Sequence, residues 1–377
     1  MQEMQVGSTT LEILQGQAVA FFAFDMGYEI SLEQVGRILA SNPKQPLSRK
    51  KQNPNYLQYA QVPHVHSLGE TQVLDHWAGE IEATIFDFGA VSIAYRWKLS
   101  TDGETVRLAD LPSLSQQLYD RNLEDHARAQ VQSLMQRIRP AITRPELSVL
   151  VEDYYVFIIE SFSEPLKADA LMRGYGDTLA QVLQFDTESL SEAQRQDALT
   201  KAISYYDRDL VLIDWNASII YDSDYRDTLN VLELLNVELL EARYMDAQLD
   251  KRIKNYEGLS PKQPAWVMPL SIPYRQSINE LAELRIESAV LAERVDNSLK
   301  LIGDLYLARV YSAASEQFYM PTWDASISRK LDIIGNLYQL LTDRVNSHQA
   351  QMLEIIIIIL ILIEIFLSLY SLSHPGA

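Results

Sequence analysis

Cysteine is absent from the 377-residue chain, and so are the short motifs that mark several common enzyme classes. Without cysteine there is no disulfide, no thiolate metal site and no cysteine nucleophile. The sequence contains no G-x-x-x-x-G-K-[ST] loop, no G-x-G-x-x-G fingerprint and no G-x-S-x-G elbow. Asp87-Phe88-Gly89 spells a kinase magnesium motif, but the other kinase motifs are missing and a hairpin turn is indicated instead. The sequence therefore implies no cofactor and gives poor support for an enzyme.

Basic residues are also scarce, because 32 Lys and Arg face 51 Asp and Glu and give a net charge of −19. A general nucleic-acid surface needs clustered Lys and Arg, so direct nucleic-acid binding is not expected. Residues 1–8 lack the basic flank and apolar core of a signal peptide, and they lack the Arg-rich character of a transit peptide. We therefore expect the bulk of the chain to stay in the cytoplasm where it is made.

The chain does have one long apolar run, at residues 352–372. Fourteen of the eighteen residues in 355–372 are Ile, Leu or Phe. Eighteen helical residues extend about 27 Å, close to the ~30 Å hydrocarbon core of a bilayer. A wholly buried core helix is the alternative, but such a helix normally has a polar stripe. The pattern predicts a single transmembrane anchor at 352–372, with Glu354 and Glu364 as its polar residues, and a short tail at 373–377.

Residues 1–221 predict a mixed α/β domain, and the chain as a whole an α+β fold. Residues 80–86 and 90–97 form the clearest β pattern and predict a hairpin in which Gly89 supplies a positive φ. Ser31 and Gln34 have the spacing of a capping box and predict the start of a short helix. Further strands are expected at 17–30, 56–66, 148–160 and 209–221, and helices at 113–138, 165–185 and 189–203.

Residues 222–351 predict a helical bundle or coiled-coil stalk. Apolar residues recur at alternating spacings of three and four in helices expected near 232–253 and 275–318, with Asp246 interrupting the first. A third helix carries the clearest seam, formed by Ile327, Leu331, Ile334, Tyr338, Leu341 and Val345. Such a seam suits either an intramolecular bundle or an oligomeric stalk, and both interpretations stay open.

Three histidines form the most plausible metal-binding group. His64 and His66 would share one face of a strand, as two imidazole ligands require, and His76 lies nearby. Half of the six histidines can fall in such a short stretch by chance, so these residues are weak candidates.

Four stretches carry a family resemblance: the strand pair containing Phe86 and Gly89, the helix His126-Ala127-Arg128-Ala129-Gln130, the segment Leu212-Ile-Asp-Trp-Asn-Ala217, and the run that begins at Leu353-Glu354. Over about residues 80–372 the chain resembles the family required for meiotic nuclear division, whose bacterial members are filed as YagE-like. The resemblance implies an integral membrane protein without known catalytic residues. In eukaryotes the family is mitochondrial, and one member holds ribosomes near the inner membrane.

Together these observations favour a non-catalytic, homo-oligomeric scaffold or adaptor tethered to a membrane. It would present its α/β domain to a cytoplasmic protein or a ribosome-associated partner. We expect the bacterial cytoplasmic membrane, because no transit peptide is apparent, with the mitochondrial inner membrane as the alternative. A second hypothesis is a membrane-bound, metal-dependent enzyme that uses His64, His66 and His76. A third is an oligomeric membrane assembly with a transport or pore role, suggested by Glu364 in the middle of the span.

Overall fold

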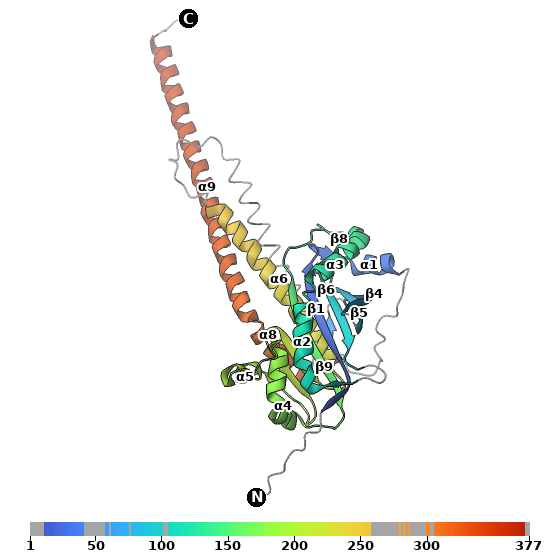
Figure 1. The fold of residues 1–377 in the computed structure, drawn as a ribbon. Coiled ribbons are helices and arrows are strands. Elements are labelled where there is room, and N and C mark those ends of the chain that lie inside the picture. The colour runs from blue at the N-terminus through green and yellow to red at the C-terminus, as the bar shows by residue number, and fades with distance from the viewer. Residues whose placement is uncertain are drawn as a thin grey trace. The chain divides into compact units, whose positions relative to one another are not determined.

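The computed structural model describes residues 11–40, 57–59, 62–74, 77–100, 105–257, 299–301 and 305–373, together with the single positions 279, 282 and 286. The chain divides into two compact units. The first unit comprises Met1–Tyr244 and Glu293–Asp324, and the second comprises Met245–Ala292 and Ala325–Ala377. Helices α6 (Arg226–Glu257) and α9 (Met320–Ser373) are labelled in Figure 1. Each of them contributes residues to both units.

The first unit is a mixed α/β domain built on a nine-stranded sheet with the order β10-β11-β12-β9-β1-β6-β5-β4, in which β7 also pairs with β1. Its pairs are antiparallel except for the parallel pair β9 and β12. The strands are β1 (Glu12–Asp25), β4 (His64–Leu74), β5 (Trp77–Ile85), β6 (Ala90–Lys98), β7 (Val106–Arg107), β9 (Glu152–Phe162), β10 (Ala202–Ile203), β11 (Leu210–Ile213) and β12 (Ala217–Tyr221). Two small sheets pair β2 (Glu29–Ile30) with β8 (Ile142–Thr143), and β3 (Leu57–Tyr59) with β13 (Leu299–Leu301).

Strand β1 is the central strand of the domain. It pairs with β6 from Gln17 to Asp25 and with β9 over much of its length. Residues 18–25 are all buried, as expected when both faces of a sheet are covered. Because successive side chains of a strand point to opposite faces, Phe22 and its even-numbered neighbours face one layer, and Phe21 and its odd-numbered neighbours face the other.

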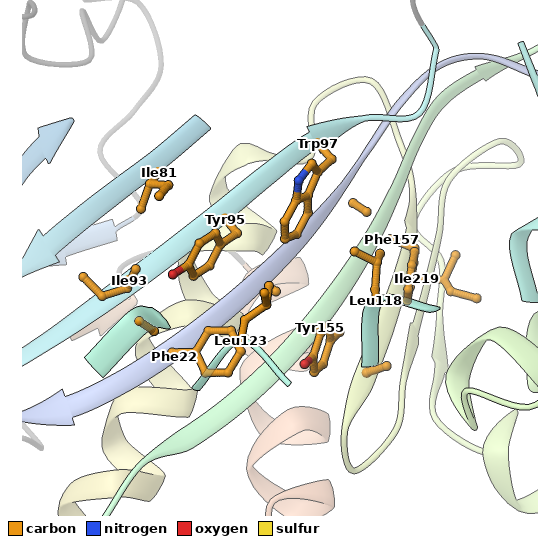
Figure 2. Close-up of a cluster of buried hydrophobic side chains, with 14 of the residues drawn as sticks. Phe22, Ile81, Ile93, Tyr95, Trp97, Leu118, Leu123, Tyr155, Phe157 and Ile219 are labelled. Carbon is orange, nitrogen blue, oxygen red and sulfur yellow. The ribbon is translucent and has the colours of Figure 1, made fainter. Parts of the chain in front are cut away.

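The first layer contains the main hydrophobic core. Four helices supply it: α1 (Leu32–Leu39), α2 (Leu111–Asp120), α3 (Glu124–Ile138) and α4 (Ala168–Leu183). Figure 2 shows its aromatic centre, where Phe22 meets Tyr95 and Tyr155 edge to face, with ring centroids 5.9 and 6.3 Å apart. Tyr95 stacks on Trp97 at 5.7 Å. Such aromatic pairs each add about 0.5–1.5 kcal/mol beyond the burial of their surface.

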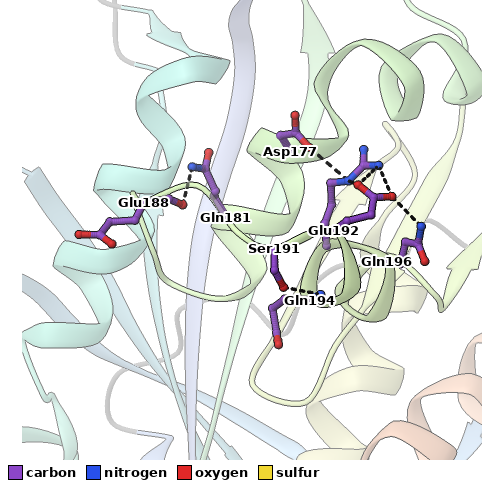
Figure 3. A network of polar contacts seen from close by, with 8 residues as sticks. Asp177, Gln181, Glu188, Ser191, Glu192, Gln194 and Gln196 are labelled. Atoms are coloured by element: carbon purple, nitrogen blue, oxygen red, sulfur yellow. Dashed lines mark hydrogen bonds and ion pairs between the residues drawn. The ribbon is translucent and has the colours of Figure 1, made fainter.

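The turns and caps follow the sequence signals. The β5–β6 hairpin forms as predicted, and Gly89 has φ +107°. Helix α1 begins at the predicted cap, where Ser31 Oγ accepts from the backbone N–H of Gln34 at 3.4 Å. Helix α5 (Glu192–Ala198) begins in the same way at Ser191, and Figure 3 shows the polar contacts around it. These contacts are exposed and contribute little to stability individually.

Helices α6 and α8 (Leu305–Gln317) cover the second face of the sheet. Asn236 of α6 donates to the carbonyl oxygen of Glu152 on β9 at 3.1 Å. Phe318, just after α8, lies edge to face against Tyr154 of β9, with ring centroids 4.8 Å apart. The prediction of one continuous helix over 275–318 is wrong, because Leu299–Leu301 pairs as β13, although Leu305–Gln317 is helical as α8. The earlier part of that prediction lies almost wholly outside the described residues.

In the second unit, the C-terminal end of α6 contacts α9. Asp246, which interrupts the apolar pattern of α6, pairs with Lys330 of α9 at 2.8 Å, and Asp250 pairs with the same lysine at 2.7 Å. Ser326 Oγ donates to Asp246 at 2.8 Å. Burial lowers the pKa of Lys330, but hydrogen bonds and charges from the two aspartates raise it overall. The polar interruption is therefore the position at which the two helices form an ion pair.

The predicted membrane anchor needs a correction. Among the residues that the structure describes, no helix is long and apolar enough to cross a membrane. The prediction of a transmembrane helix at 352–372 is therefore wrong, and the tail-anchored, single-pass membrane localisation that rested on it is wrong as well.

Candidate functional site

The most unusual surface of the described residues is the segment 353–367 of α9, called here the apolar segment. Thirteen of its fifteen residues are Ile, Leu or Phe, and their exposed fractions run from 48% at Ile356 to 70% at Phe366. The other two are Glu354 and Glu364, and both are exposed. The apolar residues occupy every side of the helix, so the segment has no polar face to turn towards water.

The seam before the apolar segment is partly buried. Ile327 and Ile334 are buried, whereas Leu331 and Tyr338 are half-buried. The side chains of Leu341 and Val345 lie outside the described residues. The same three-and-four spacing continues into the apolar segment at Ile355, Ile359, Leu362 and Phe366. The seam therefore joins a stretch packed within the protein to a stretch that is exposed.

The predicted motif around His126 lies on α3. The ring nitrogen Nδ1 of His126 lies 2.6 Å from the hydroxyl of Tyr95, and the two rings are 5.7 Å apart. Ala127 is buried, Gln130 is half-buried and Ala129 is exposed. The histidine thus ties α3 to strand β6, which is what a structural role requires.

The other two predicted motif residues lie at the β5–β6 turn. Phe86 is buried against Phe88, with ring centroids 5.2 Å apart. A Cβ atom at Gly89 would lie 1.8 Å from the carbonyl oxygen of Gly27. Both residues therefore contribute to the packing of the β5–β6 turn. This turn is separate in sequence from the helix that carries His126.

The histidine group is only partly within the described residues. His64 and His66 lie on β4 with the spacing that shares one face, opposite Ile85 and Ala83 of β5. Burial lowers the pKa of both, and in His66 the charges of Arg137 and His64 lower it further. His76 lies outside the described residues. Among the residues that are described, no group of three or more His, Asp or Glu side chains could hold a metal ion.

Sequence reasoning missed a set of buried acids on α6. Residues 231–242 are all buried, and they include Glu233, Glu238 and Glu241 with exposed fractions of 6%, 4% and 1%. Asn236 is equally buried. Buried glutamates are rare unless they are paired. The sequence feature that could have predicted their burial is the run from Val231 to Leu240, in which apolar residues occupy all sides of the helix and the acids lie among them.

Comparison with known proteins identifies the family to which the α/β domain is similar. A family model described as "Uncharacterized protein MJ0711, N-terminal domain" matches residues 15–228, from β1 to the start of α6. The curated Uncharacterized protein MJ0711 of Methanocaldococcus jannaschii is 25% identical over 221 residues, which cover 58% of this chain and 66% of that protein. No solved structure matches the chain. The resemblance to the required-for-meiotic-nuclear-division or YagE-like family is therefore wrong, because the matching family is a different one. The chain belongs to the MJ0711 N-terminal domain family.

Proposed function

We propose that this protein is a non-catalytic scaffold or adaptor that self-associates through the apolar segment of α9. The assembly presents the α/β domain to a protein or ribonucleoprotein partner. The observation that carries this proposal is the exposure of thirteen large apolar side chains on one helix. Because the whole chain has a net charge of −19, it would meet a ribonucleoprotein through the protein component of that partner.

The size of the apolar segment supports a protein–protein interface. Thirteen large side chains that are about half exposed present an apolar surface on the order of 1,000 Å², whereas the largest patch on a typical monomer is about 300–600 Å². A standard interface buries about 800 Å² on each partner. The segment therefore offers as much surface as a stable interface needs.

The pattern of the segment favours another copy of the chain as the occupant. The heptad seam that begins at Ile327 continues through Ile355, Ile359 and Leu362. In a parallel coiled coil, equivalent residues of each copy meet, so an apolar seam is automatically complementary to itself. Because the apolar residues surround the helix, an assembly of several copies would cover more of the segment than a pair.

Cysteine cross-linking tests this proposal directly, because the chain has no native cysteine. Ile359→Cys places a single thiol in the seam, and Ile361→Cys places one about 200° away around the helix. Glu188→Cys, on an exposed loop of the other unit, is the distant control. Under mild oxidation, Ile359→Cys should form covalent dimers far more efficiently than either control. Equal cross-linking at all three positions would overturn the proposal, as would flotation of uncross-linked chains with lipid vesicles.

A further inference from the structure

The buried acids of α6 include one carboxyl group without a hydrogen-bond partner. Glu241 is 1% exposed, and neither Oε1 nor Oε2 has a partner among the described residues. Leaving a buried carboxylate unpaired costs far more than leaving a neutral group unpaired. Glu241 is therefore compatible with its burial only when it carries a proton.

A second buried acid, Asp25, lies on the sheet face that α6 covers, because it shares the odd-numbered face of β1 with Phe21. Asp25 ends β1, is 6% exposed, and accepts a hydrogen bond at Oδ1 from the backbone N–H of Gly27 at 3.1 Å. Burial, and after it the charge of Asp25, raises the pKa of Glu241. Two carboxyl groups that interact in a buried site cannot both ionise without strong repulsion.

The other charged groups around the pair do not neutralise it. Arg243 of α6 is paired with Glu152 of β9, which stands opposite Ala23 in the sheet. Burial raises the pKa of Glu152 to about 7; Arg243 opposes this rise, and Asp153, beside it on β9, adds to it. Glu146, in the segment between β8 and β9, adds a further negative charge that acts on Asp25.

Arg128 of α3 lies over the ring of Phe24, next to Asp25 in β1, and binds Glu124 and the carbonyl oxygens of residues 148 and 149. Arg243 and Arg128 are thus both engaged with other acceptors. Asp25 and Glu241 therefore carry uncompensated negative charge when they ionise.

We propose that Asp25 and Glu241 form a proton-operated latch that holds α6 against the sheet. When the carboxyl groups carry their protons, α6 packs with its buried face in place. When both ionise, like charges confront each other in a site closed to water, and α6 loosens from β1. Because α6 contributes residues to both units, the latch controls the element that they share.

The electrostatics agree with this geometry. Burial, opposed by the Gly27 hydrogen bond and reinforced by Glu146, raises the pKa of Asp25 to about 7. Burial and then Asp25 raise the pKa of Glu241 well above its ordinary value. A raised folded-state pKa means that the packed state binds more protons than the open one. The packing of α6 against the sheet is therefore most stable below the ordinary carboxyl pKa of about 4. It loses stability as the pH rises through the raised pKa that these carboxyl groups have in the folded protein.

Hydrogen exchange on the full chain tests the latch. Exchange of the α6 amides, corrected for intrinsic rates, should increase between about pH 5 and pH 7 by roughly tenfold per pH unit for each titrating carboxyl group. The amides of α4 serve as the internal reference. Glu241→Gln and Asp25→Asn each remove one titrating group while keeping the shape of the side chain, and Glu188→Gln is a matched exposed control.

We expect both latch variants to flatten the pH dependence of α6, and Glu188→Gln to keep it. A wild-type profile in which α6 changes no more than α4 would overturn the proposal. So would latch variants whose α6 profile matches that of the wild type. If Glu241→Gln does not fold, Asp25→Asn and the wild-type profile still decide the question.

Discussion

Replacing Gly89 with alanine should destabilise the α/β domain strongly. Gly89 has φ +107°, a conformation that a residue with a side chain adopts only under strain. That strain costs about 1–3 kcal/mol. In addition, the new Cβ atom would lie 1.8 Å from the carbonyl oxygen of Gly27. The two backbones cannot simply separate, because Met26 N–H donates to the carbonyl of Gly89 at 3.0 Å.

The steric overlap adds about 1–3 kcal/mol, as overpacked sites do. The total loss is therefore about 2–6 kcal/mol, a large part of the ~5–15 kcal/mol that stabilises a typical domain. Urea unfolding of the wild type and the variant measures this loss through the midpoint of the transition.

Gly69 provides a matched control for the steric part. It has nearly the same φ, +109°, at an irregularity of β4, but no atom of the described residues lies within 4 Å of an added Cβ. Gly69→Ala should therefore lose only the conformational part, about 1–3 kcal/mol. If Gly89→Ala costs no more than Gly69→Ala, the close approach of Gly27 is not what requires glycine at this turn.

Two further substitutions test contacts on each unit. Lys330→Met should lower the stability of the second unit by about 1–3 kcal/mol, because Asp246 and Asp250 then face each other without their cation. Thermal unfolding measures this loss of stability, and an unchanged melting temperature would contradict the prediction. His126→Ala should cost about 1–3 kcal/mol, because it leaves the buried Tyr95 hydroxyl unpaired. Tyr95→Phe in the same background should recover part of that loss in a double-mutant cycle, and strict additivity would show that the hydrogen bond contributes nothing.

Local features of the fold could be predicted from the sequence because their causes are local. The β5–β6 hairpin follows from strand alternation around a glycine, and the cap at Ser31 follows from a hydroxyl within reach of the next turn. The sequence shows Asp246 as a break in an apolar pattern. It does not indicate that the partner of Asp246 is Lys330, which lies 84 residues further along the chain. Local chemistry thus indicates where an irregularity lies, while tertiary packing decides what it contacts.

The features that sequence reasoning missed depend on distant segments. The three-residue strand β13 stands in a pattern that reads as helical, and it forms because β3, more than two hundred residues earlier, pairs with it. Glu241 is buried because the sheet and its neighbours enclose α6 from several sides, whereas a periodic pattern places charged residues towards solvent. The membrane prediction counted apolar residues in the sequence, whereas among the described residues no helix is long and apolar enough to cross a membrane.

Self-association through the apolar segment is the property on which the proposed scaffold function depends. Sedimentation velocity of the purified full chain, compared with an Ile359→Asp and Leu362→Asp double variant, measures this directly. We predict that the wild type sediments as an oligomer of the 43.0 kDa chain, and that the double variant sediments as a monomer with an unchanged melting temperature of the α/β domain. A monomeric wild type, or a double variant that remains oligomeric, would contradict the account.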